Sequence, residues 1–507
     1  MFFIQFNENK KKYIQLADYI KNMIENGSLT YGGKLPSTRE LSEELKIGRS
    51  TVMKSYELLE MEEYIYTIKG KGTFINQLKI KRDNEKKSPQ SVSINWESSI
   101  NNYAKRAVDL DIMKWDAQYK KGMISFKSIA PDGDTFDIEG FKRAFYNRLS
   151  IEGSNLLNYG YAKGYKPLTE WLLEYIKDKG VNIEGKDILI TNGFTEGLNL
   201  ALSAICESGD KVICENPTHN TAIKIMKMRD IQIIGVDIKS REGIDTNELK
   251  KIINNNDVKA VFLIPSYHNP TGLVMSYEKR EEIYSILSEK NIPIIEDWFA
   301  EELNYSGDHI KSITAIGGSN NNVINIGSFS KILFPGMRIG WIFADKELID
   351  VLESIKRAMN IHTSFIDQGI LYEYLKSEQF PQFIKRIRRR YKQKYELMKE
   401  MVEEEIKYEY LWGDGGLYMY VILNEKIKVR TLLERCIKRG VIFTCGDVFS
   451  VSNIQSNGIS SNKVKIENGL RLGFSKLKNS EIKKGIKIIG EEIEEMLNNN
   501  SQKDSLK

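Results

Sequence analysis

Short apolar runs alternate with helical segments over most of this chain, and this alternation constrains its fold more than any other feature. The runs are Ile188–Ile190, Lys211–Cys214, Ala260–Ile264, Ile292–Ile295 and Val323–Ile326. Apolar strands separated by helices form a mostly parallel sheet that is covered on both faces. We therefore predict an α/β domain over residues 121–497, with a large part at about 160–350 and a smaller C-terminal α+β part at about 385–497.

The chain has 507 residues, which exceeds one ordinary domain. Residues 1–76 are short helical segments that end in a Gly-Lys-Gly hairpin. Residues 77–120 are polar, with a mixed-charge run followed by Ser88 and Pro89, and we predict a linker there. Because Trp96 and Trp115 lie within it, docking of part of this segment is the alternative to a fully flexible linker. Residues 498–507 are polar, so we expect a frayed tail.

Composition excludes several classes of protein. A net charge of +5 excludes a histone-like polycation and an acidic tail protein, and 41% hydrophobic residues exclude global disorder. The four cysteines form no C-x-x-C pair and there are only four histidines, so we expect free thiols in a reducing compartment and no metal site. No apolar run approaches the roughly 20 residues of a membrane helix. The default expectation is a cytoplasmic protein with no membrane partner.

The N-terminal region has the pattern of a helix-turn-helix. Ser37 or Thr38 can cap a helix that runs through Leu45, and a second helix follows the turn at Ile47–Gly48, from about Arg49 to Met61. In such an arrangement the start of the second helix reaches base edges, while hydroxyl groups and the helix N-terminus hold phosphates. Its polar and cationic start consists of Arg49, Ser50, Thr51 and Lys54.

A cationic hairpin follows these helices. Tyr64–Ile68 and Thr73–Ile75 flank a glycine-containing tip, which predicts a wing whose tip is Lys69, Gly70 and Lys71. The total charge of this region does not indicate whether it binds DNA, since residues 1–76 contain 11 basic and 10 acidic residues. Their placement at the reading helix and the wing favours a DNA-binding face. On pattern alone, a helical oligomerisation cap remains the alternative.

Several motifs in this region are similar to the winged helix of GntR-type transcription regulators. They are Leu35–Ser42, Ile47–Val52, Tyr56–Leu59 and Gly70–Phe74, in order and at the family's spacing. The resemblance implies that Arg39 and Arg49 contact DNA and that the wing at Lys69–Gly70 enters the minor groove. Some members have a further basic residue where this chain has Met53, so contacts there are expected to differ.

The C-terminal region contains the residue types that a pyridoxal phosphate site requires. Lys331 lies within Gly327–Gly340 and can bind the cofactor aldehyde, while Ser328 and Arg338 supply a hydroxyl and a cation for a phosphate. A solvated surface lysine is the alternative, but the Ile, Phe and Met residues around Lys331 do not suit it.

Three further segments follow apolar runs. Asp297 can pair with a ring nitrogen, although a lone Asp at a strand end more often caps a helix. Thr191–Gly197 is a glycine turn into a helix, which suits a phosphate. Asn269, within Pro265–Gly272, can donate to a ring oxygen, or its segment is a plain turn.

Taken together, residues 121–497 resemble the fold-type I aminotransferases. The similar motifs are Tyr159–Gly164, Gly209–Val212, Asn269–Gly272, Glu296–Asp297, Ser328–Lys331 and Gly469–Gly473. The resemblance implies that Lys331 holds pyridoxal 5'-phosphate, that Asp297 faces its ring nitrogen and that Asn269 faces its phenolic oxygen. The residues implied for the phosphate are Phe194, Thr195, Ser328 and Arg338, with Tyr159 from a neighbouring subunit.

The resemblance also implies that Arg471 takes the carboxylate of an amino-acid ligand, and that the protein is a homodimer. Two positions depart from the pattern. His219 stands where relatives stack an aromatic ring, often Tyr, on the cofactor, and Phe299 stands where many have Tyr. We expect the cofactor to bind but its electronic tuning to differ.

A GntR-type winged helix joined to an aminotransferase-like domain is the layout of the MocR subfamily of regulators. This resemblance implies a head-to-tail dimer, and a flexible linker of 44 residues spans roughly 35–40 Å. One hypothesis is a regulator that binds a double-stranded DNA operator and senses an amino acid or vitamin B6 compound. The others are a working aminotransferase and a cofactor-free scaffold.

Overall fold

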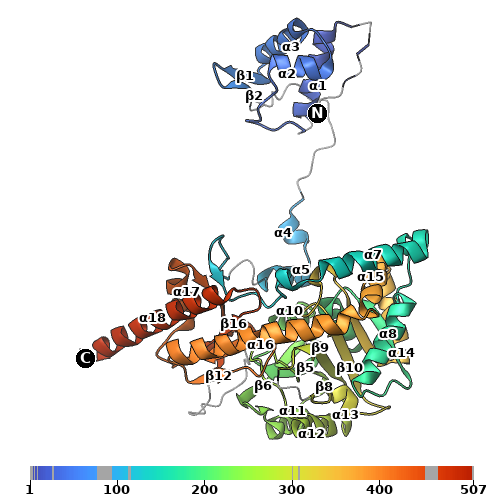
Figure 1. Cartoon of the computed structure of the whole chain (residues 1–507), viewed down its shortest axis with the longest axis vertical. Coiled ribbons are helices and arrows are strands. Elements are labelled where there is room, and N and C mark those ends of the chain that lie inside the picture. The colour runs from blue at the N-terminus through green and yellow to red at the C-terminus, as the bar shows by residue number, and fades with distance from the viewer. Residues whose placement is uncertain are drawn as a thin grey trace. The chain divides into compact units, whose positions relative to one another are not determined.

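The computed structural model describes residues 4, 6–7, 10–25, 28–76, 94–111, 116–299, 301–305, 309–451 and 466–504. The chain forms two compact units, residues 1–95 and 96–507, whose elements are labelled in Figure 1 and which are described separately below. Within the described ranges, no helix is both long enough and apolar enough to cross a membrane.

The smaller unit packs three helices against a hairpin. Its elements are α1 (Lys12–Glu25), α2 (Thr38–Leu45), α3 (Arg49–Met61) and the antiparallel strands β1 (Ile65–Ile68) and β2 (Gly72–Ile75). Leu16, Leu41 and Val52, one from each helix, are fully buried in its core. Ser37 caps α2, and Glu40 accepts the Ser37 backbone N–H at 2.7 Å in return. The predicted winged helix-turn-helix is confirmed.

The larger unit is built on an eight-stranded sheet in which β6, β5, β8, β9 and β10 pair in parallel. In spatial order the strands are β4 (Lys186–Thr191), β11 (Gly340–Asp345), β10 (Val323–Ser328), β9 (Ile294–Phe299), β8 (Val258–Leu263), β5 (Lys211–Asn216), β6 (Gln232–Ser240) and β7 (Gly243–Ile244). All five predicted apolar runs overlap these strands, with only Ile264 and residues 292–293 lying just outside them, so the mostly parallel sheet is confirmed.

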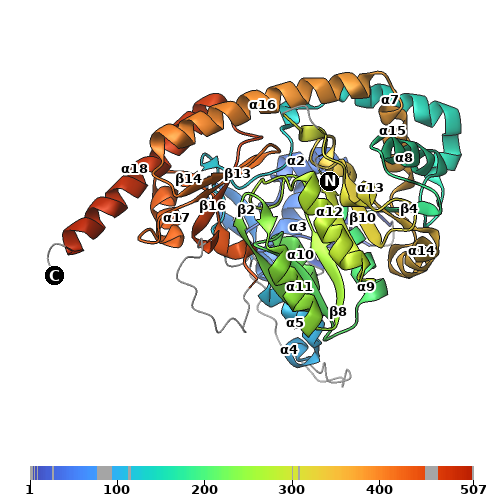
Figure 2. The same cartoon turned by 90° about the horizontal axis from the view of Figure 1, so that it is seen from below.

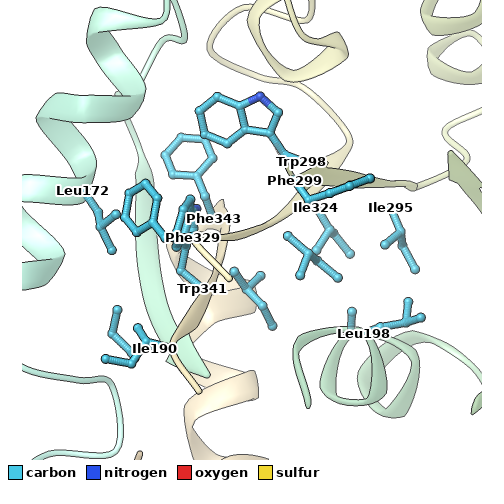
Figure 3. Packing of buried hydrophobic residues seen from close by; sticks show 14 of the residues in the cluster. Leu172, Ile190, Leu198, Ile295, Trp298, Phe299, Ile324, Phe329, Trp341 and Phe343 are labelled. Atoms are coloured by element: carbon cyan, nitrogen blue, oxygen red, sulfur yellow. The ribbon is translucent and has the colours of Figure 1, made fainter. Parts of the chain in front are cut away.

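Alternating side chains of the sheet face two different cores. Ala260 and Phe262 of β8 join one core, whereas Val261 and Leu263 join the other. Figure 3 shows part of the first core, in which Phe329 packs on Trp341 at 4.9 Å between ring centroids. Helices contributing to the first core are α7 (Ile138–Glu152), α8 (Lys166–Asp178), α9 (Phe194–Ile205), α10 (Asn220–Met228), α14 (Lys346–Asn360) and α15 (Phe365–Leu375). The second core includes α11 (Thr246–Asn255), α12 (Tyr277–Ser288) and α13 (Ile313–Ile316).

A second, antiparallel sheet forms the smaller part of this unit. Its strands are β12 (Tyr410–Trp412), β13 (Tyr418–Ile422), β16 (Gly469–Gly473) and β15 (Thr444–Cys445), and α17 (Val429–Lys438) and α18 (Asn479–Asp504) accompany it. Just before β15 in the chain, β14 (Val441–Ile442) pairs in parallel with the distant strand β3 (Ile124–Ser125). The long helix α16 (Gln379–Glu405) contributes residues to both the main core and the core of this part, and Figure 2 shows it running along the outside.

Two segments are more ordered than a flexible linker and a frayed tail would be. The predicted linker contains α4 (Trp96–Ser99) and α5 (Asn102–Asp109), and α5 is held on α10 because Arg106 donates to the Met228 carbonyl at 3.1 Å. Of the rest of the predicted linker, residues 77–93 and 112–115 lie outside the described residues. The expected polar tail is not frayed from residue 498, since α18 continues to Asp504.

Candidate functional site

The smaller unit presents the starts of two helices with exposed cations. Helix α3 begins at Arg49, after Gly48, which makes no side-chain capping bond. In its first turn the Thr51 N–H donates to the Gly48 carbonyl at 2.9 Å. The start of the helix still carries the positive end of the helix dipole, which suits an anion. Arg49, Ser50 and Lys54 are exposed and Thr51 is partly buried. The Arg49 Nε donates to Thr38 Oγ1 at 3.3 Å, which ties the start of α3 to the start of α2.

Arg39 lies on α2 with its side chain 78% exposed and paired to Glu43. The wing tip, Lys69 to Lys71, is also exposed. Gly70 has a φ of +80°, in the region that favours glycine, so the tip turns tightly between β1 and β2. The structure thus leaves every predicted DNA-contacting side chain at least partly accessible on this unit.

In the larger unit the predicted residues meet at one edge of the main sheet. His219 follows β5, Asn269 follows β8 and Lys331 follows β10, while Asp297 lies within β9 rather than at its end. These strands are parallel neighbours, so their carboxyl ends converge at one edge, where α/β folds place their ligands.

Lys331 and Asp297 have strongly perturbed proton affinities. Burial lowers the pKa of Lys331 to about 8, and the positive charge of Arg471 contributes to that lowering. Burial raises the pKa of Asp297 well above its ordinary value, and the Lys331 cation opposes that shift. The Asp297 Oδ1 is buried and has no hydrogen-bond partner among the described residues. This carboxyl group is therefore available to a buried cationic donor.

Arg471 is buried on β16 and fixes Asn269. Its Nη1 donates to the Asn269 Oδ1 at 2.8 Å, and its guanidinium lies over the Phe449 ring at 4.8 Å and the Tyr418 ring at 5.6 Å. Burial lowers the pKa of Arg471 to about 10. Its Nε has no hydrogen-bond partner within the described part of the chain, so a donor remains for a ligand. Sequence reasoning missed Tyr418 and Phe449, because nothing in their local sequence signals a contact with β16.

The turn into α9 forms a seat for an anion, which we call the phosphate seat (residues 192–195). Gly193 has a φ of +76°, and a Cβ atom there would lie 2.5 Å from the Arg338 Nη2. Any other residue would be strained at this φ and would displace the guanidinium. Arg338 also donates to the Asn192 carbonyl at 3.3 Å. Ser328, by contrast, uses its hydroxyl within the loop, accepting the Ser330 N–H at 3.1 Å.

His219 lies beside the seat, with its ring centroid 5.5 Å from that of Phe194. Burial lowers the pKa of His219 to about 3, so the imidazole is neutral near pH 7. Tyr159 is not brought to these residues within the chain. It is 81% exposed, and its ring packs edge-on against His362 at 6.0 Å.

A cavity of about 1140 Å³ opens beside the phosphate seat. Thr195 and Arg338 are the two predicted site residues that line it. Part of its wall comes from α5 and the residues after it, at Tyr103 and Asp109 to Asp111. Lys224 of α10 lies 3.6 Å from the Asp111 carboxylate, which secures this wall.

Residues 122–489 match the family described as aminotransferase class I and II, and residues 12–75 match the bacterial regulatory proteins of the gntR family. The chain belongs to the class I and II aminotransferases. With its GntR domain it has the MocR-type layout of a DNA-binding regulator fused to an aminotransferase-like domain. The uncharacterised HTH-type transcriptional regulator YdfD of Bacillus subtilis is 26% identical over 97% of this chain and 99% of its own length.

Solved aminotransferases share the fold of the larger unit. The multiple substrate aminotransferase of Thermococcus profundus gives a TM-score of 0.71 at 26% identity, covering 80% of this chain and all of its own. LysN, the α-aminoadipate aminotransferase of Thermus thermophilus, gives a TM-score of 0.69 at 25% identity, covering 80% of this chain and 99% of its own. That structure was solved with N-(5'-phosphopyridoxyl)-L-leucine.

Proposed function

We propose that this MocR-type protein is a transcription regulator that binds pyridoxal phosphate in its larger unit and changes its DNA binding when an amino acid or vitamin B6 compound occupies that site. One observation carries the proposal: the chain retains both an exposed cationic helix start and a buried cofactor-type site, and it aligns with the regulator YdfD over almost the full length of both chains.

The unpaired groups of the larger unit fit the cofactor. Asp297, with its buried unpaired Oδ1, would face the ring nitrogen, and the neutral His219 would lie against the ring. Lys331 would hold the aldehyde. The phosphate would lie on the seat, contacted by Phe194, Thr195 and Arg338 and bordered by Ser328. When bound, pyridoxal phosphate withdraws electrons from an attached amino acid.

The chain's own side chains then orient the ligand. Because Arg471 fixes the Asn269 oxygen, the Asn269 Nδ2 is left to donate toward the phenolic oxygen. The free Nε of Arg471 suits the carboxylate of an amino acid. The lowered pKa of Lys331 leaves a substantial fraction of neutral amine near pH 8, which can accept or return a proton.

The exposed Tyr159 supports a homodimer in this proposal, since its hydroxyl would reach the phosphate seat of a second copy in a head-to-tail arrangement. Helix α5 supports a route for the signal. It lines the cavity at the seat and follows the chain segment that leads from the winged helix, so a ligand can shift DNA binding by favouring one placement of α5.

The test combines DNA binding and cofactor absorbance in the full-length chain. We expect the wild type to bind its own upstream region, to show the visible absorbance of lysine-bound cofactor, and to change its DNA affinity at least several-fold with pyridoxal phosphate plus a responsive amino acid. Lys331→Ala should lose the absorbance and the response but keep basal DNA binding, whereas the exposed-lysine control Lys290→Ala should keep all three. A response that survives Lys331→Ala would contradict the proposal.

A working aminotransferase is the second candidate, favoured by the retention of Lys331, Asp297, Asn269 and Arg471 and by the fold shared with LysN. It predicts sustained conversion of an amino acid with a keto-acid acceptor at ordinary enzyme rates, about 1 per second or faster. A sensor predicts a single half-reaction at most. Measuring product beyond one equivalent of protein separates the two.

A further inference from the structure

A buried ion pair is bonded directly to the phosphate seat. Lys356 of α14 has no exposed side-chain surface, and its Nζ is 3.2 Å from the Oε2 of Glu196 in the first turn of α9. The same ammonium also donates to Asn360 Oδ1 at 3.1 Å and Thr363 Oγ1 at 3.0 Å. All three of its protons therefore have acceptors, and its position is fixed.

The Glu196 carboxylate is fixed just as firmly. Its Oε2 accepts the backbone N–H of Asn192, and its Oε1 accepts from the Asn360 side-chain amide. The side chain is only 11% exposed, so water screens its charge weakly. This negative charge is bonded directly to the seat, at the end of α9 where the N–H groups would face a phosphate.

A carboxylate at this position opposes phosphate binding unless a cation neutralises it, because two negative charges repel strongly in a weakly screened setting. Arg338, which donates to the Asn192 carbonyl, would attract the phosphate, but it does not contact Glu196 in any described interaction. Among the residues that the structure describes, Lys356 is the cation that pairs with Glu196.

We propose that Lys356 is a positioning residue that neutralises Glu196, so that the N-terminus of α9 can accept the phosphate of the cofactor. This inference rests on the proposed binding of pyridoxal phosphate. Burial lowers the pKa of Lys356, and the facing Glu196 carboxylate opposes that shift, which is consistent with a charged pair. The pair also joins α9 to α14, so a loss of stability alone would not distinguish a neutralising role from a mechanical one.

The test therefore compares two ligands that differ only in the phosphate. Dissociation constants for pyridoxal phosphate and for pyridoxal are measured by cofactor absorbance in the full-length wild type, Lys356→Met, Glu196→Gln and the double variant. We expect Lys356→Met to weaken the binding of pyridoxal phosphate about tenfold and that of pyridoxal less than about twofold. The reason is that the uncompensated negative charge of Glu196 acts on the phosphate alone. The double variant, which is again neutral, should recover most of the lost affinity.

Equal losses for the two ligands, or a double variant as weak as Lys356→Met, would overturn the neutralising role. Glu196→Gln gives an independent arm: it should bind pyridoxal phosphate at least as tightly as the wild type, and selective weakening would also overturn the inference. If Lys356→Met does not fold, Lys356→Gln keeps side-chain donors and gives the same comparison. A wild type without cofactor absorbance would instead refute the proposed function, whereas equal wild-type affinity for both ligands would refute this inference alone.

Discussion

The two units of this protein place the positive charges of their candidate sites in opposite environments. In the winged helix, Arg39, Arg49 and Lys71 are exposed to water. In the aminotransferase-like unit, Arg471 is only 7% exposed and lies against two aromatic rings, and burial lowers the pKa of Lys331. When exposed cations bind DNA, they release the counterions condensed on it, so their contribution to affinity depends on the salt concentration. Buried cations have lost their hydrating water and are stabilised by specific neighbours. Their contribution to ligand binding therefore depends on pH and on single contacts.

The largest expected effect tests whether one exposed cation can nevertheless contribute to DNA sequence specificity. Arg49→Ala should weaken operator binding by about 1–3 kcal/mol, roughly five- to 160-fold, if Arg49 reads a base edge. Binding to unrelated DNA should fall much less, and both are measured by gel shift at fixed salt. Met61→Ala, at the exposed far end of α3, is the matched control. Equal weakening on all sequences would place Arg49 among the phosphate contacts instead.

The next prediction concerns pH in the aminotransferase-like unit. Attachment of pyridoxal phosphate requires the neutral amine of Lys331, whose pKa is about 8, so attachment should increase as pH rises through that value. The Arg471 cation helps to hold this pKa down. Arg471→Met should therefore move the midpoint to higher pH by roughly half a unit to one unit.

Absorbance titrations of the lysine-bound cofactor measure this midpoint. The control is Arg389→Met, since Arg389 is exposed on α16 and acts on Lys331 in none of the described interactions. A midpoint that stays in place or moves to lower pH in Arg471→Met would show that the two buried cations do not interact as described.

The same contrast explains how far sequence reasoning reached. The winged helix could be predicted almost completely, because its signals are local: Ser37 and Glu40 are three residues apart and form the cap themselves. The order of apolar runs likewise predicted the parallel sheet, whereas only the resemblance to the aminotransferases singled out His219.

The remainder depends on contacts that no local pattern encodes. Lys356 reaches Glu196 across 160 residues, and Arg471 reaches Asn269 across 202. Helix α5 lies in a stretch whose polar composition is typical of a linker, yet Arg106 and Asp111 attach it to α10 through partners far along the chain. Such docking is decided by tertiary partners, so polarity alone could not reveal it.

The smallest expected effect sharpens the comparison at the wing. Lys71 is exposed beside Gly70 and has no role in the core, so Lys71→Ala should weaken binding only a few-fold and about equally on all DNA sequences. Losing one phosphate contact should flatten the slope of log affinity against log salt concentration by about one. The slope is measured by gel shifts over a salt series, again with Met61→Ala as control. A sequence-dependent loss with an unchanged slope would mean that the wing reads bases, and the contrast between the two units would then lie in burial alone.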